Sequence, residues 1–205
     1  MDWKIYERNT YHSESDVRLA NKTITIDTLG DFLSKRIDRY NRDGMRHSLF
    51  ALILCHKHNF CHLLAVKNAK GELCLLGGKK TLYNSDKECL RSKLQKYIRP
   101  PKSLKNSLDI AAFDSHVEIG QVVAQWWKTK VDGRYLPYIP PHASTCVETA
   151  TIFQVTVQPG CIFQLPPGHT LVAVSLIDLM EEESILCGVP HVVCRHKILY
   201  MTHAN

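Results

Sequence analysis

The chain has 205 residues, 44% of them hydrophobic, and a formal net charge of +6. This size predicts a single domain with a substantial buried core. No apolar run approaches the roughly 20 residues that cross a bilayer, and the charged N-terminus lacks the apolar core of a signal peptide, so we expect a soluble, intracellular protein.

The eight cysteines do not form a recognisable disulfide or zinc pattern. They contain no CxxC pair and lie mostly in apolar runs, which is typical of small buried hydrophobes in a reducing compartment. His56, His58, Cys61 and His62 are close in sequence and are the residue types that bind zinc. However, no distant ligand pair accompanies them, so we predict solvent-facing histidines at a hairpin and no metal site.

The first quarter of the chain is predicted to contain an arm and then a helix. Residues 1–26 are polar and suggest an irregular N-terminal arm that ends in a short edge strand at Thr23–Ile26. The remaining residues, 27–205, are then the main domain. A helix begins after Thr28, carries apolar residues along one stripe, and ends at Gly44.

The central stretch alternates strands with a second helix. Two continuous apolar runs, residues 49–55 and 62–66, predict buried strands joined by a turn at His58–Asn59. A short apolar strand, residues 73–76, is expected to end at the double glycine 77–78. Ser85 and Glu88 then form a capping box for an amphipathic helix that closes at Pro100 and Pro101.

The second half is predicted to be mainly strands. A polar linker over 100–117 is followed by a strand over 117–127 and a proline-rich extended surface segment over 136–142. A hairpin of residues 150–157 and 161–165 then turns at Pro159-Gly160. A strand over 171–180 and a terminal helix over 188–200 complete the chain. Adjacent tryptophans on a strand point to opposite faces, so one of Trp126 and Trp127 can pack in the core while the other is free for an interface.

Positive charge is concentrated beside the double glycine. From Lys79 to Lys105 there are nine Lys or Arg residues against Asp86 and Glu88 alone. Such a flank would attract phosphate groups. A solvated helix face that only increases solubility is the alternative interpretation.

The order of strand, double glycine, loop and helix resembles the Nudix box. That box contains an arginine and several glutamates, and the glutamates hold magnesium. The corresponding positions here are Asn84, Ser92, Lys93, Lys96 and Tyr97. The resemblance implies an α/β protein, a Nudix-type α/β/α sandwich with a mixed central sheet. Magnesium requires oxygen ligands, which these residues do not supply, so we predict a protein that is not an enzyme and has no metal or other cofactor.

A narrower resemblance covers residues 27–200. The Trp126-Trp127 pair, the LPYIPPH stretch at 136–142 and the IFQVTV and VPHVVCRHKILY stretches are similar to the small subunit of the pre-mRNA cleavage factor I family, which is catalytically inactive. This implies a nuclear homodimer in mRNA 3′-end cleavage and polyadenylation. The family binds UGUA-type single-stranded RNA and recruits a larger subunit with an RNA-recognition domain.

The candidate site residues follow from this resemblance. Animal members have two aromatic residues where this chain has Glu72-Leu73, an arginine in place of Phe32 and a glutamate in place of Phe50, so UGUA selectivity is expected to be weakened. The candidate RNA-binding residues are Phe32, Phe50, Leu73, Leu75, Lys79 and Lys80, and the candidate partner or dimer interface comprises Trp126, Trp127, Tyr138 and Pro140. The alternatives are a dimeric scaffold without RNA binding and a Nudix hydrolase that uses Glu72 and Glu88 as unusual metal ligands.

Overall fold

The computed structural model of the chain describes residues 2–20, 29–81, 85–101, 110–129, 134–143, 145–182 and 184–201. Its elements in chain order are β1 (Trp3–Glu7), η1 (Arg8–Thr10), β2 (His12–Ser15), η2 (Val17–Leu19), α1 (Leu29–Asp43), β3 (Arg46–Lys57), β4 (Phe60–Lys67), β5 (Leu73–Cys74), β6 (Leu76–Lys79), α2 (Asp86–Tyr97), β7 (Ile98–Arg99), α3 (Ile110–His116), β8 (Val117–Thr129), β9 (Tyr135–Leu136), β10 (Cys146–Val157), β11 (Ile162–Leu165), β12 (Thr170–Ser175), η3 (Asp178–Glu181), η4 (Ile185–Gly188), α4 (Val189–Val193) and β13 (Ile198–Tyr200).

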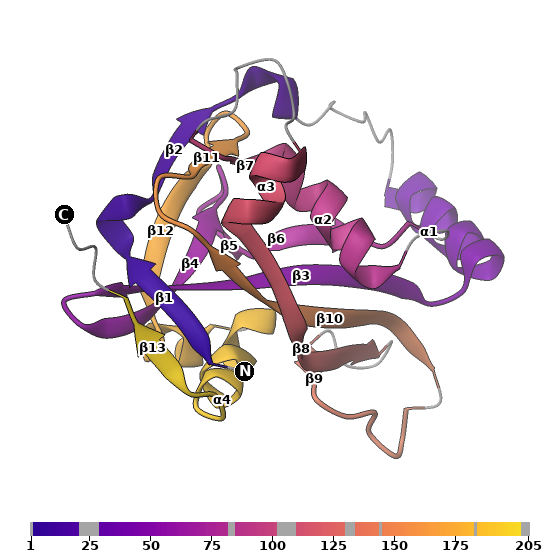
Figure 1. Cartoon of the computed structure of the whole chain (residues 1–205). Coiled ribbons are helices and arrows are strands. Elements are labelled where there is room, and N and C mark those ends of the chain that lie inside the picture. The colour runs from indigo at the N-terminus through magenta and orange to yellow at the C-terminus, as the bar shows by residue number, and fades with distance from the viewer. Residues whose placement is uncertain are drawn as a thin grey trace.

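A large mixed sheet organises the fold. Its strand order is β12-β4-β3-β10-β8-β9, with β1, β5, β6 and β13 paired at its sides, and a separate small sheet has the order β2-β11-β7. β3 pairs parallel with β10 and antiparallel with β4 and β6. Figure 1 shows α2 and α3 on one side of the long strands β3 and β10 and α4 on the other. The expected α/β class with a mixed central sheet is therefore confirmed.

Two cores form because the central strands are apolar on both faces, as the continuous apolar run of β3 predicts. The first core packs α2 and α3 against the sheet and includes Leu49, Ala51, Ile53, Leu90, Leu94, Phe113, Phe153 and Val155. The second core packs η3, η4 and α4 against the opposite face and includes Leu52, Leu54, Trp126, Ile152, Leu179, Leu186, Val189 and Val193. Side chains of β3 alternate between the two cores, as strand geometry requires.

The N-terminal residues are not an irregular arm. Trp3 and Ile5 are fully buried on β1, which pairs parallel with β13 and with β3. β2 joins the small sheet by pairing with β11. The edge strand predicted at residues 23–26 lies outside the described residues.

The local signals for helix ends are confirmed. α1 ends at Gly44, which has φ +72° and donates its N–H to the Tyr40 carbonyl at 2.8 Å. α2 begins with both hydrogen bonds of the Ser85 and Glu88 capping box and ends at Tyr97, before Pro100. None of the described helices is long and apolar enough to cross a membrane.

Several predicted connections are wrong. β10 and β11 flank the predicted Pro159-Gly160 turn, but they belong to different sheets and do not form a hairpin. The expected linker over 100–117 contains α3, and the expected terminal helix is only the five-residue α4 followed by the strand β13. β11 pairs with β2 and β13 pairs with β1, and both partners are distant in sequence, which local patterns do not report.

The histidines of the β3–β4 turn divide into two groups. His58 and Asn59 have positive φ values of 51° and 61°, and His58 is exposed as predicted. His56 is buried instead, because the C-terminal strand covers it and the Met201 carbonyl lies 3.1 Å from its Nε2. Among the described residues, no three His, Cys, Asp or Glu side chains form a group that could hold a metal ion.

Candidate nucleic-acid interface

Three of the six predicted RNA-binding residues lie together on the second-core face of the sheet. Phe50 on β3 and Leu73 on β5 are half-buried and pack against the second core. Leu75 is a buried member of that core, so it supports this surface and does not present a side chain to a ligand. The side chain of Phe32, on α1, lies outside the described part of the structure.

The double glycine does not end a strand but lies inside β6. Gly77 pairs with Phe50 in the β3–β6 ladder, and a Cβ on Gly77 would lie 2.1 Å from the Leu49 carbonyl oxygen. A glycine is required here because the two backbones approach too closely for any side chain. Gly77 therefore serves strand packing, and it places β6 directly beside Phe50.

Gly78 faces the other side of the sheet, beneath α2. The Lys93 Nζ lies 3.8 Å from the position of a Cβ on Gly78. Lys96 is exposed, and Tyr97 packs against the first core. This face of α2 thus presents the Lys93 ammonium to Gly78, and Tyr97 is directed into the core. These residues do not supply the carboxylate oxygens that magnesium requires. Asn84, the other predicted position, is outside the described residues.

The adjacent Lys79 and Lys80 are held by different helices. Lys79 Nζ lies 3.3 Å from the Asp43 carboxylate at the end of α1, and Lys80 Nζ lies 2.5 Å from the Asp86 carboxylate at the start of α2. Lys79 also pairs in register with Ser48, so its side chain shares the face of Phe50. Of the two lysines, Lys79 is therefore the one that borders the second-core surface.

Asp43 receives two positive groups. The Arg42 guanidinium has the larger effect and the Lys79 ammonium the smaller one, and together their hydrogen bonds lower the pKa of the Asp43 carboxyl to about 2. Asp43 thus stays ionised and fixes the position of Lys79 near the sheet.

A polar cluster borders the same surface and was not predicted from the sequence. Ser48 is fully buried and donates its hydroxyl to Glu148 Oε1 at 2.6 Å, and Arg46 Nε lies 3.4 Å from the same oxygen. Tyr135 on β9 lies near this group, because it pairs with Lys128 on β8, which in turn pairs with Glu148 on β10. Burial and then Glu148 raise the pKa of the Tyr135 phenol. The only sequence signal was a serine and a glutamate within strand-like runs.

Lys128 adds a further cation, since its Nζ lies 5.4 Å from the centre of the Tyr135 ring. The surface of Phe50, Lys79, Arg46 and Tyr135 therefore combines two half-buried aromatic rings with two cationic groups. We call these four residues the aromatic–cationic surface. Aromatic rings flanked by cations are the features that stack bases and contact phosphates of single strands.

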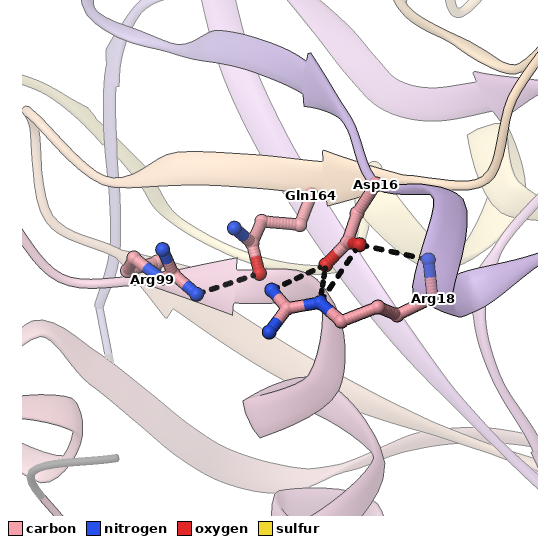
Figure 2. Close-up of polar contacts among 4 residues, drawn as sticks. All are labelled: Asp16, Arg18, Arg99 and Gln164. Atoms are coloured by element: carbon pink, nitrogen blue, oxygen red, sulfur yellow. Dashed lines mark hydrogen bonds and ion pairs between the residues drawn. The ribbon is translucent and has the colours of Figure 1, made fainter. Parts of the chain in front are cut away.

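The rest of the predicted basic flank is partly neutralised. Arg91 pairs with Asp114 on α3. Arg99 lies on β7 in the small sheet, where it donates to Gln164 Oε1 at 3.2 Å beside the Asp16–Arg18 ion pair (Figure 2). Arg18 is the main cause, with a smaller effect from Arg99, of the lowered pKa of Asp16. These arginines thus bind neighbouring side chains and do not form one continuous basic stripe with Lys79.

The predicted partner interface is only partly exposed. Tyr138 is 59% exposed and Trp127 is half-buried, as an interface would require. Trp126 is buried while Trp127 is not, which agrees with the prediction that one tryptophan of the pair packs in the core. Pro140 is also buried within the chain. Trp126 packs in the second core so closely that a Cβ on Gly188 would lie 2.5 Å from its ring.

Comparisons with known proteins test the family resemblance that the sequence indicated. The NUDIX_2 model, described as nucleotide hydrolase, matches residues 1–196. The chain is 25% identical over 201 residues to cleavage and polyadenylation specificity factor subunit 5 of Dictyostelium discoideum, covering 96% of this chain and 95% of that protein. It is 26% identical to pre-mRNA cleavage factor Im 25 kDa subunit 2 of Arabidopsis thaliana, covering 75% of this chain and 73% of the relative. For subunit 1 of the same factor and organism the identity is 24%, over 87% of this chain and 76% of the relative. The resemblance expected from the sequence is therefore confirmed, and these named relatives are cleavage factor subunits, not hydrolases.

Proposed function

The chain belongs to the NUDIX_2 family, and from this membership we propose that it is a non-catalytic subunit of an mRNA 3′-end cleavage and polyadenylation factor that binds single-stranded RNA. The three cleavage factor relatives support the role in 3′-end processing. The observation that carries RNA binding is the position of Phe50 beside Lys79 and Arg46 on one face of the sheet.

The absence of hydrolysis is supported by the face of α2 that meets Gly78. Lys93 places a positive charge where a divalent cation would have to approach, and Tyr97 is occupied in core packing. Repulsion between like charges and the missing oxygen ligands both oppose magnesium binding. The fold then serves as a binding surface on which substrate chemistry does not occur.

RNA contact is assigned to the aromatic–cationic surface. Stacking of one base on an aromatic ring contributes about 1–3 kcal/mol and tolerates any base. Lys79 and Arg46 would contact phosphates, which position a strand without reading its sequence. Since Glu72-Leu73 replaces an aromatic pair of animal members and Leu75 is buried, we expect salt-sensitive binding with little preference for UGUA.

The partners follow from the same proposal. A homodimer in the nucleus, joined by a larger subunit with an RNA-recognition domain, agrees with relatives that are named as subunits of a factor. Tyr138 and Trp127 are the accessible members of the predicted interface and would contact these proteins. A monomeric mass in light scattering at micromolar concentration would contradict the dimer.

The test is fluorescence anisotropy with labelled UGUA-containing and scrambled single strands over a series of salt concentrations. Lys79→Ala should weaken the binding of both RNAs equally. It should also reduce the slope of log affinity against log salt concentration by about 1, as expected for one lost phosphate contact. Phe50→Leu should reduce both affinities by the stacking contribution, about 1–3 kcal/mol. Lys57→Ala is the matched control, because this lysine is exposed at the far end of β3.

Two outcomes would reject parts of this proposal. A strong UGUA preference in the wild type would show that specific base recognition persists. No binding of either RNA at low salt would instead support a dimeric scaffold that contacts only proteins, the second candidate function, which the replaced aromatic pair at Glu72-Leu73 favours.

A further inference from the structure

The large sheet divides where β1 and β10 meet the same edge of β3. β10 pairs with β3 from Arg46 to Ile53, and β1 pairs with it at Cys55 and His56. Both strands must use the same edge, because β4 occupies the other edge of β3 from Leu54 to Lys57. β1 therefore continues along β3 where β10 leaves it (Figure 1).

A cavity of about 220 Å³ lies at this division of the sheet. It is lined by residues from β1, β8, β10 and β13 together with the residue before β1, namely Asp2, Lys4, Glu118, Gly120, Gln154, Thr156 and Leu199. None of these belongs to the aromatic–cationic surface. The cavity is thus a separate feature of the molecule.

Gln154 is the unusual residue of this cavity. It is 4% exposed, and its buried side-chain oxygen Oε1 accepts no hydrogen bond from any described residue. A Cβ on Gly120 would lie 3.5 Å from the Gln154 side-chain amide carbon, so Gly120 leaves room for this side chain across β8. An unsatisfied buried acceptor is costly, so either an ordered water or a donor from a bound group is needed to complete it.

The charge of the lining favours a positively charged donor. Asp2 and Glu118 contribute two carboxylates against the single ammonium of Lys4. Glu118 pairs in register with Thr156, which places its side chain next to that hydroxyl at the mouth of the cavity. Among the described residues, Asp2 makes one ion pair, a long and exposed contact with the cation of Lys197 at 3.8 Å, and such an exposed pair contributes little.

We propose that this cavity binds the guanidinium group of an arginine side chain from a protein partner. A guanidinium carries five N–H donors and no acceptor, so it can satisfy Gln154 Oε1 and a carboxylate at the same time. It is also less strongly hydrated than an ammonium group, which lowers the cost of partial burial.

The size of the cavity agrees with one side chain. Sites for small molecules commonly have about 300–1,000 Å³, and this cavity is smaller. The carboxylates of Asp2 and Glu118 oppose the approach of RNA phosphates, since like charges repel. A protein side chain is therefore the occupant that the lining favours.

The test titrates blocked amino acids into the full chain and follows the amide signals by two-dimensional NMR. Arginine with an acetylated N-terminus and an amidated C-terminus should shift the Gln154 side-chain amide and the Gly120 backbone amide in a saturable way. The matching citrulline compound has nearly the same shape without the charge, and it should bind at least about tenfold more weakly, because it cannot form a charge-assisted pair with the carboxylates of Asp2 and Glu118.

Two variants separate binding from folding. Gln154→Met keeps a similar volume but removes the unsatisfied oxygen, so it should weaken arginine binding about tenfold and leave the unfolding midpoint unchanged or higher. Glu118→Gln should weaken binding similarly by removing one charge. Glu14→Gln on the exposed strand β2 is the control and should leave binding unchanged.

Several results would overturn the assignment. These are no saturable shift with the arginine compound, equal binding of citrulline, equal binding of the blocked lysine compound, or unchanged binding in both cavity variants. Shifts of the same amides by a single-stranded oligonucleotide would assign the cavity to RNA instead. None of these outcomes bears on RNA binding at Phe50 and Lys79, because the two sites share no residue.

Discussion

The side-chain nitrogen of Lys93 lies 3.8 Å from the point where a Cβ would project from Gly78. The residue thus brings a positive charge to the helix face on which a Nudix hydrolase would hold its metal. We predict no magnesium-dependent hydrolysis of nucleoside polyphosphates or diphosphate-linked nucleosides, measured by chromatography of the products. An active pyrophosphatase assayed in parallel is the positive control.

Glu88→Gln sharpens this test. The Glu88 side chain accepts the Ser85 N–H at 3.2 Å, and glutamine can accept the same bond, so the helix cap survives. Magnesium-dependent turnover by the wild type that this variant abolishes would contradict our prediction and support the hydrolase alternative.

Gly77 and Gly78 should respond differently to alanine. Gly77→Ala forces a Cβ into the backbone of Leu49, and the φ of +149° adds strain, so we expect a loss of about 3–5 kcal/mol in unfolding free energy. Gly78→Ala meets only the distant Lys93 Nζ and should cost about 1–3 kcal/mol from its φ of +139° alone. Urea unfolding followed by circular dichroism measures both, and equal losses would show that the contact with β3 is unimportant.

The pKa of Asp43 should rise when its partners are removed. Arg42→Ala should raise it most and Lys79→Ala less, from about 2 toward the usual 3.8. Because the folded pKa is depressed, this carboxyl stabilises the fold above pH about 4, and the contribution disappears as pH falls toward about 2. NMR titration of the carboxyl carbon tests this, with Lys80→Ala as the control that should change nothing, since Lys80 pairs with Asp86.

The cluster around Glu148 should be sensitive to the loss of its acceptor. Glu148→Ala leaves the buried Ser48 hydroxyl without its partner, so we expect a cost of about 2–4 kcal/mol. Glu148→Gln keeps an oxygen for Ser48 and should cost less. In the Gln variant the pKa of Tyr135 should also fall, because the carboxylate that helps to raise it is gone. Phenolate absorbance reports that shift, and an unchanged Tyr135 titration would place Glu148 outside its environment.

Much of the fold could be predicted because several of its signals are local. The apolar run of β3, the turn at His58–Asn59 and the capping box of α2 each involve residues close in sequence. The partners of β10 and β11 could not be predicted, since Pro159-Gly160 specifies a turn but not the sheet that each strand joins. Gly77 of β6 was misinterpreted as the end of a strand, because only the distant backbone of Leu49 explains it.

The candidate site was predictable only in part for the same reason. Phe50 was named as a candidate from the sequence, but the Ser48–Glu148 contact joins residues 100 positions apart and has no local signature. Lys79 and Lys80 are neighbours in sequence, yet they bind different helices. Strand pairing thus decided which of the predicted residues share one surface.

The parallel pairing of β1 with β13 has a consequence for the order in which the protein is made. Trp3 is aligned with Ile198, so β1 cannot pair with β13 until the chain as far as Ile198 has left the ribosome. Until then the apolar side chains of Trp3 and Ile5, which are fully buried in the finished protein, remain exposed. Contacts between such distant residues form late and slowly, so β1 is exposed to aggregation while the rest of the chain is being made.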